Sequence, residues 1–179
     1  FVRRVAAHMG IRKHVNIWVS ELINSPVTIG FLKPIILVPV AAINNLTTQQ
    51  LEAVLLHELA HIRRFDYMLN LIITFIRTIL YFNPFVKLII TTIEREREKS
   101  CDEMVMQFQY DPHGYASALL LFQKGNYVQK QMAIAANGRK SDLLHRVERI
   151  LGMEKKPILS FNRLAGMLAG LLCVIALNA

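Results

Sequence analysis

Residues 54–66 read VLLHELAHIRRFD and contain two histidines, His57 and His61, four positions apart. On an α-helix this spacing places both imidazoles on one face, about one turn apart, so they can share a metal ion. Glu58 directly follows the first histidine, and this directs its carboxylate to the side where a metal-bound water could be deprotonated. The pattern H-E-x-x-H is short enough to arise by chance, so the prediction of a metal centre depends on its surroundings.

A tetrahedral catalytic zinc site needs a third protein ligand and an open position. The downstream segment EREREKSCDE, residues 94–103, offers four candidate glutamates: Glu94, Glu96, Glu98 and Glu103. Helical spacing places Glu94, Glu98 and Asp102 on one face, so that Glu98 could ligate while Asp102 stands behind it near a histidine N–H. Periodicity alone does not choose between Glu94 and Glu98.

Local signals place the histidine motif inside a helix. Thr47 is a good N-cap, Gln50 stands three residues later to complete a capping box, and Leu46 and Leu51 can form a hydrophobic staple. Apolar residues flank the histidines, which favours a buried helix. The sequence therefore predicts a core helix that begins at about residue 48 and carries both candidate ligands.

The remaining elements are predicted from hydrophobic patterning and turn residues. A short basic helix is expected to end near Gly10, followed by strands within residues 15–22, 26–32 and 34–39 that we expect to form a small antiparallel sheet. Residues 67–93 are strongly apolar and predict two helices joined or kinked at Asn83 and Pro84, which we expect to be a core hairpin that contacts a membrane. Further helices are predicted over residues 94–108, 111–123 and 141–151.

The composition favours a membrane setting. The 179 residues suit one domain, 53% of them are hydrophobic and only 19% are charged, and the net charge is +8. Residues 164–177, LAGMLAGLLCVIAL, are uncharged and fit either the start of a transmembrane helix or a short packed helix. We expect the former, with residues 163–179 beginning a transmembrane helix after a domain of residues 1–162. Two cysteines predict no disulfide framework.

The positions of the basic residues distinguish a membrane partner from a nucleic acid. Nine of them precede the apolar segment, with only two aromatic residues, Tyr127 and Phe161, among them: Lys124, Lys130, Arg139, Lys140, Arg146, Arg149, Lys155, Lys156 and Arg163. This positive-inside pattern predicts that the segment before residue 163 is cytoplasmic. No direct nucleic-acid contact is expected.

The motifs HELAHIRRFD, FNP and EREREKSCDEMV, preceded by SPVTIGFLKPIILVP, resemble the membrane zinc metallopeptidases of the BlaR/MecR antirepressor, or β-lactam-sensor, type. They are more distantly similar to the HtpX and CAAX-prenyl-protease gluzincins. The resemblance implies a mainly helical α+β fold of the gluzincin type and one Zn²⁺ per chain, bound by His57, His61 and the Glu98 of an E-x-x-x-D pattern ending at Asp102. It also implies that Glu58 is the general base.

The resemblance further implies that Asp66 is an acid that supports the site or the fold, although an Asp in this position is often a turn former or a partner of Arg63 or Arg64. It implies that a peptide substrate adds as a strand along Val27, Thr28, Ile29 and Gly30. Tyr115 and Arg146 could stabilise an oxyanion but are kept outside the predicted catalytic set. For Cys101 we expect a packing role.

We therefore expect a zinc endopeptidase on the cytoplasmic face of the bacterial inner membrane, within a longer signalling protein that could act as a homodimer. By resemblance, its substrate would be a cytoplasmic regulator, such as a repressor or an anti-sigma factor, or the protein itself. The alternative is a catalytically silent signal transducer in which zinc only stabilises the fold. The chain has no S-x-x-K acylation motif, so nothing in it points to β-lactam sensing in particular.

Overall fold

The computed structural model describes residues 1–130 and 137–153. The chain is mainly helical, as expected, and its elements follow one another as α1 (Val2–His8), β1 (Asn16–Ser20), β2 (Val27–Ile29), β3 (Ile35–Pro39), α2 (Val40–Asn45), α3 (Thr48–Arg63), α4 (Asp66–Ile79), α5 (Pro84–Gln107), α6 (Pro112–Lys130) and α7 (Asn137–Ile150). The expected transmembrane helix from residue 163 lies outside the described residues. Within residues 1–130 and 137–153, no helix is both long and apolar enough to cross a bilayer.

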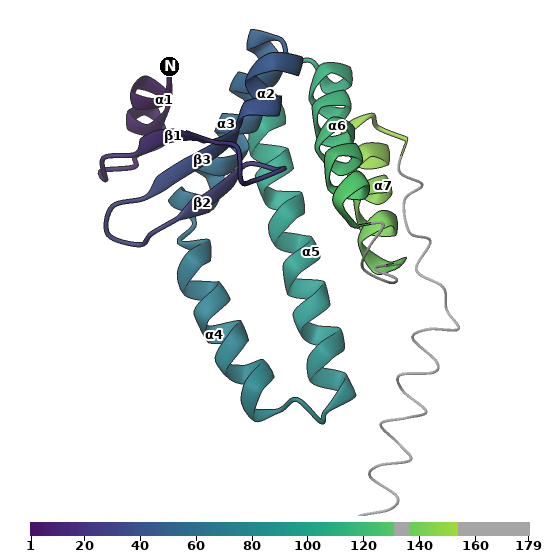
Figure 1. The fold of residues 1–179 in the computed structure, drawn as a ribbon. Helices are drawn as coiled ribbons and strands as arrows, with labels where there is room; N and C mark the ends of the chain where they lie inside the picture. Colours follow the sequence, from purple (N-terminus) through teal and green to yellow (C-terminus); the bar gives the residue numbers. More distant parts are fainter. Residues whose placement is uncertain (131–136, 154–179) are drawn as a thin grey trace, which may run out of the picture.

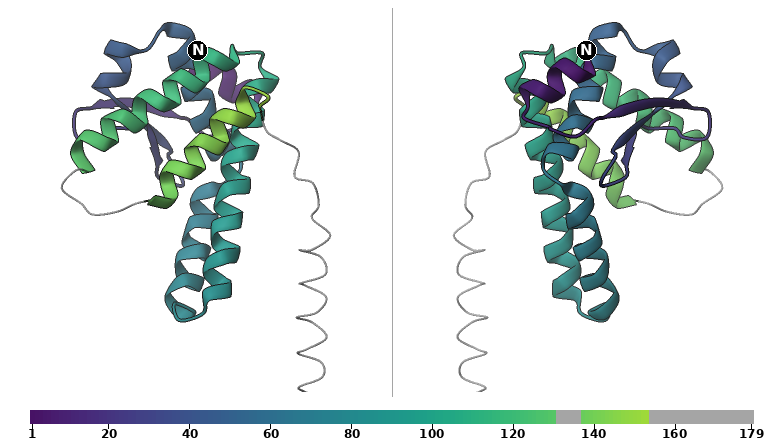
Figure 2. Two further views of the ribbon diagram at one scale, coloured as in Figure 1. Left: turned by 90° about the vertical axis from the view of Figure 1, so that its right-hand side faces the viewer. Right: turned by 90° about the vertical axis from the view of Figure 1, so that its left-hand side faces the viewer.

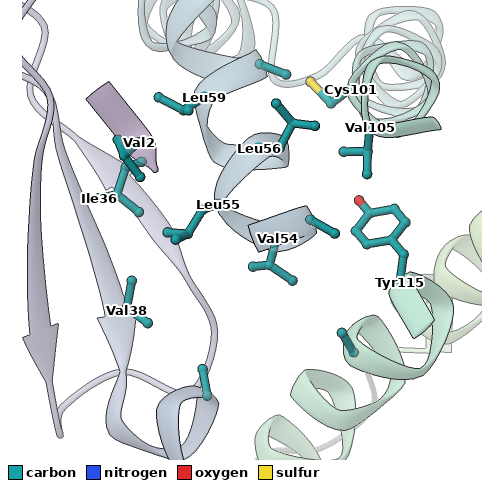
Figure 3. Close-up of a cluster of buried hydrophobic side chains, with 14 of the residues drawn as sticks. Val2, Ile36, Val38, Val54, Leu55, Leu56, Leu59, Cys101, Val105 and Tyr115 are labelled. Atoms are coloured by element: carbon teal, nitrogen blue, oxygen red, sulfur yellow. The ribbon is translucent and has the colours of Figure 1, made fainter. Parts of the chain in front are cut away.

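Helix α3 is the centre of the fold. The predicted capping box is confirmed, because the Thr47 side chain accepts a hydrogen bond from the Gln50 backbone N–H and the Gln50 side chain accepts one from the Thr47 N–H. One side of α3 packs against the sheet and another against α5 and α6 (Figure 3). The buried side chains at these contacts include Ile36, Val38, Leu55, Leu56, Leu59, Val105 and Tyr115. The motif helix is thus held on several sides.

The three strands form one mixed sheet in the order β1-β3-β2, so the prediction of an antiparallel sheet was wrong for β1. Strand β2 is antiparallel to β3, but β1 runs parallel to it. Strand β3 lies at the centre and is the most buried of the three, while β1 and β2 each form an edge. An apolar pattern identifies a strand but does not encode its direction.

The turn between β2 and β3 requires a glycine. Gly30 has a φ of +84°, and a Cβ at this position would lie 2.8 Å from the Lys33 carbonyl oxygen. Gly30 therefore follows the edge strand instead of extending it, because β2 ends at Ile29.

The predicted break at Asn83 and Pro84 is confirmed, since α4 ends at Ile79 and the Asn83 side chain caps α5. Two other predictions for this region were wrong. Helix α5 runs without interruption from Pro84 to Gln107, because no Gly or Pro separates its apolar part from its charged part. The hairpin of α4 and the first part of α5 also does not belong to the core, because it projects from the body of the molecule (Figures 1 and 2).

The last two described helices complete the body. Helices α6 and α7 pack against each other, α6 also contacts α3, and α7 contacts α5. They contain almost all of the predicted segments 111–123 and 141–151, since α6 begins at Pro112 and α7 ends at Ile150. The short helix α2 was not predicted from the sequence, whereas α1 was expected and ends at His8, two residues before Gly10.

Candidate metal centre

The two motif histidines face each other from consecutive turns of α3. Their Nε2 atoms lie 3.1 Å apart, and the rings meet edge to face with centroids 4.8 Å apart. His57 is only 6% exposed. Helix α3 therefore brings two imidazole nitrogens close together beside a buried side chain.

The hydrogen-bond partners of the other ring nitrogens favour the same tautomer for both rings in their neutral form. The Tyr115 hydroxyl donates to Asp102 Oδ1 at 2.7 Å, so its oxygen is available to accept from His57 Nδ1 at 2.8 Å. The Nδ1 of His61 donates to Asp66 Oδ2 at 2.6 Å. With both Nδ1 atoms acting as donors, each neutral ring has a lone pair on Nε2. A metal ion bound by both lone pairs, or a proton held between the two nitrogens, accounts for their separation of 3.1 Å.

This donor set fits a zinc ion. Two imidazole nitrogens that bind one tetrahedral zinc at 2.0–2.1 Å stand about 3.3 Å apart, close to the separation of the two Nε2 atoms. Both Nδ1 atoms are hydrogen-bonded, as ligating histidines usually require. The side chains of His57, His61 and Glu98 bring three ligand atoms within 4.8 Å of one another.

Glu98 is the glutamate that α5 directs to the histidines. Its Oε2 lies 3.5 Å from His57 Nε2, and its Oε1 lies 3.8 Å from His61 Nε2. Glu94, the alternative that helical spacing left open, instead pairs with Arg77 at 2.9 Å and is about half exposed. Glu96 and Glu103 are exposed on α5. Of the four candidates, the structure brings only Glu98 to the described metal centre.

Asp102 lies behind His57, one turn after Glu98. It is 2% exposed and its Oδ1 is 3.2 Å from His57 Nδ1. Two hydrogen bonds from Arg146 on α7 hold this carboxylate, from Nε at 2.9 Å and from Nη2 at 2.8 Å. The same guanidinium reaches Glu98 Oε2 at 2.9 Å through Nη1.

Tyr115 and Arg146 therefore belong to the centre, although sequence reasoning kept them outside the catalytic set. They lie 13 and 44 residues after Asp102 and share no spacing pattern with it. The only sequence signal was their residue type, because each can donate a hydrogen bond to a carboxylate. In the structure their hydrogen bonds go to Asp102, so they orient the acid behind His57.

Asp66 opens α4 immediately after α3 ends. Phe65, with a φ of 56°, reverses the chain and places Asp66 against His61. Its carboxylate is 3% exposed and lies 3.7 Å from Arg64 Nε and 3.7 Å from Arg97 Nε. The structure thus brings this predicted acid to a histidine and also to Arg64, one of the two arginines considered as its partner.

Cys101 lies beside the centre and is fully buried, with Sγ 3.4 Å from His61 Nδ1. With His61 and Asp66 it forms a second group of close ligand atoms, but His61 Nδ1 already donates to Asp66. Burial raises the pKa of the Cys101 thiol far above its usual range, and the charges of Asp66 and Glu98 add to this effect. The thiol therefore stays protonated, which favours the expected packing role over ligation.

Glu58 points to the sheet side of α3. It is 8% exposed, and its Oε2 accepts a hydrogen bond of 2.8 Å from the Thr28 hydroxyl. Thr28 is the middle residue of β2, which is an edge strand of the sheet. Val27 and Ile29, its neighbours, are exposed. The candidate base is therefore connected directly to the predicted substrate edge.

Electrostatics keep both carboxylates near the histidines ionised. Burial alone would raise the pKa of Glu98, but the hydrogen bond and charge of His57, together with Arg146, outweigh it and lower that pKa to about 2. Burial likewise opposes ionisation of Asp102, yet His57 and Arg146 hold its pKa well below its usual range. Both side chains are thus anionic at neutral pH, as a metal site requires.

The same charges favour a cation at His57. Burial would lower the pKa of His57, but its hydrogen bonds to Asp102 and Glu98 outweigh burial and raise that pKa to about 9 without a metal. Zinc must displace this proton to bind Nε2, so zinc affinity is expected to fall as the pH decreases below that value.

Comparison of the sequence with known proteins identifies a matching family model and several relatives. A family model described as BlaR1 peptidase M56 matches residues 2–150. The methicillin resistance mecR1 protein of Staphylococcus aureus is 26% identical over 170 residues, covering 93% of this chain and 29% of that protein. The regulatory protein BlaR1 of Bacillus licheniformis is 35% identical over 88 residues, covering 49% of this chain and 14% of its own length. The chain therefore spans less than a third of the relatives that it matches.

Proposed function

Because the chain belongs to the BlaR1 M56 peptidase family, we propose that it is a zinc-dependent endopeptidase whose metal is held by His57, His61 and Glu98. The observation that carries this proposal is the 3.1 Å approach of two Nε2 atoms whose Nδ1 partners are acidic or hydroxyl groups. Such an arrangement directs both Nε2 atoms to one point and matches what zinc requires.

The residues of the centre have distinct roles in this proposal. A zinc ion held there would supply a Lewis acid that polarises a peptide carbonyl and makes water more acidic. Glu58 accepts the proton of the attacking water and returns it to the leaving amine. The hydrogen bond from Thr28 holds the Glu58 carboxylate in place. Asp66 and Asp102 orient the two imidazoles through their Nδ1 atoms.

The proposed substrate is an extended protein segment that adds to β2. The edge strand has exposed side chains at Val27 and Ile29, with Gly30 at its end, while Thr28 on the same strand contacts Glu58. A segment paired with this edge would run past the general base. The protein cleaved would be a cytoplasmic regulator, such as a repressor or an anti-sigma factor, or a further part of the same polypeptide.

We place this activity at the cytoplasmic face of the bacterial inner membrane, in a domain of residues 1–162 that precedes a transmembrane helix beginning at residue 163. Membrane lipid is then a further partner, and a homodimer remains part of the proposal. The names of the relatives, a regulatory protein and a methicillin resistance protein, support a role in signal transduction.

Removal of the metal tests this function. Chelator treatment of the purified chain in detergent should abolish cleavage of unfolded casein and of the chain itself, because the Lewis acid is lost. Adding zinc in excess of the chelator should restore cleavage. Mass spectrometry of the products gives the readout, and a chain treated in parallel with zinc-saturated chelator is the control. Cleavage that persists with all metal removed would exclude a metallopeptidase.

A further inference from the structure

The hairpin formed by α4 and the first part of α5 is the most apolar exposed surface of the described chain. It projects away from the sheet and the other helices, which is clear from three directions (Figures 1 and 2). Between Tyr67 and Ile93, fifteen large hydrophobic side chains are more than a third exposed. The aromatic residues at its end are among the most exposed, with Tyr81 at 83%, Phe82 at 70% and Phe85 at 72%. Surfaces of this kind mark an interaction site.

The apolar surface extends over both helices of the hairpin. Within it only Ile73 and Ile90 are buried. Exposed apolar side chains occur at consecutive positions, such as Leu71 with Ile72 and Leu88 with Ile89, and so cover a wide arc of each helix. A protein partner would cover one narrow stripe, whereas lipid acyl chains can surround the whole projection.

The threonine hydroxyls of the hairpin are already satisfied within it. The hydroxyls of its four threonines, Thr74, Thr78, Thr91 and Thr92, each donate to the backbone carbonyl four residues earlier at 2.7–3.0 Å. Threonines bonded in this way need no water and are tolerated in hydrocarbon. Arg77 pairs with Glu94 at 2.9 Å, towards the body of the molecule.

The charges of the hairpin match an anionic lipid surface. Residues 67–93 contain no Asp or Glu and two cations, Arg77 and Lys87. Arg77 is paired with Glu94, whereas Lys87 lies in the first turn of α5, near the end of the hairpin, so that in a shallow insertion its long side chain can reach the phosphates. A second copy of this chain offers no acid between residues 67 and 93 to pair with Lys87, which disfavours self-association there.

We propose that the α4–α5 hairpin inserts into one leaflet of an anionic bilayer without crossing it. The 14 residues of α4 are about 21 Å long, which is shorter than the hydrocarbon core of about 30 Å. Insertion would set the height of the metal centre above the membrane, because α4 begins at Asp66, which contacts His61, and α5 continues to Glu98. This inference rests on the membrane location proposed above.

A single tryptophan makes the insertion measurable. The chain contains one tryptophan, Trp18, which is 58% exposed on β1 and separate from the hairpin. We would reconstitute the full chain carrying Trp18→Phe and Phe82→Trp into vesicles of phosphatidylethanolamine and phosphatidylglycerol, with or without bromine on the acyl chains. The inserted hairpin should show loss of most tryptophan emission with brominated lipid and protection from aqueous acrylamide. Wild-type Trp18 should show the reverse and is the matched control.

The other outcomes overturn the inference. Quenching by acrylamide alone would mean that the hairpin lies in water, and protection from both quenchers would mean that a protein covers it. Phe85→Trp in the same background is the second variant, should Phe82→Trp fail to fold. Zinc content and cleavage are measured on the same samples, so an inactive metal centre and a hairpin outside the bilayer are distinguished.

Discussion

Replacement of Glu58 with glutamine is expected to reduce peptide cleavage by about 10²- to 10⁴-fold, the usual contribution of a general base, while zinc stays bound. Glutamine keeps the size of the side chain and can still accept a hydrogen bond from Thr28, which in the structure donates to Glu58 Oε2 at 2.8 Å. It cannot take a proton from water. The measurement is kcat on a cleavable substrate, together with the zinc content of the same preparation.

Glu52→Gln is the matched control for this variant. Glu52 lies on the same helix and accepts a hydrogen bond from the Tyr110 hydroxyl at 3.2 Å, outside the metal centre. Its replacement should leave kcat unchanged. If Glu58→Gln cleaves as fast as wild type, Glu58 is not the base. If signalling persists in cells without cleavage, the silent transducer describes the protein better.

Replacement of Arg146 with alanine is expected to weaken zinc affinity by about 10- to 100-fold, as found when groups that orient metal ligands are removed. Glu98 and Asp102 are like charges one turn apart on α5, and Arg146 bonds to both at 2.8–2.9 Å. Without the guanidinium the two carboxylates repel each other and Glu98 loses its fixed position. Competition with a fluorescent chelator measures the affinity.

Arg95→Ala is the control for the loss of an arginine between the same two helices. Arg95 on α5 pairs with Asp142 on α7 at 2.8 Å, but both side chains are partly exposed and away from the metal centre. Its removal should leave zinc affinity unchanged. Arg146→Lys should recover only part of the affinity, because lysine cannot make the paired contacts of a guanidinium. Equal zinc affinity in Arg146→Ala and wild type would show that Arg146 does not position the ligands.

The motif helix could be predicted from the sequence because its signals are local. Thr47 and Gln50 define its start within four residues, and the spacing of His57 and His61 determines that they share a face. The local sequence pattern could not decide whether Glu94 or Glu98 is the third metal ligand. Both lie on one face of α5, and only the packing of α5 against α3 and α4 directs Glu98 to the histidines and Glu94 to Arg77.

Other features depended on tertiary contacts that no local pattern contains. The parallel direction of β1 beside β3 is not encoded in the apolar pattern of either strand, and Arg146, 44 residues after Asp102 in the sequence, reaches it from another helix. Hydropathy identified residues 67–93 as apolar but could not distinguish a buried hairpin from an exposed one.

The most direct test of the metal centre is elemental analysis of the purified full chain in detergent without added chelator, comparing wild type with His57→Ala, Glu98→Ala and Glu94→Ala. We predict one zinc ion per chain in wild type and in Glu94→Ala, and loss or sharp weakening of zinc binding in the other two variants. Wild type that binds no metal even after zinc is supplied, or Glu98→Ala that retains full zinc binding, would contradict the proposed ligand set.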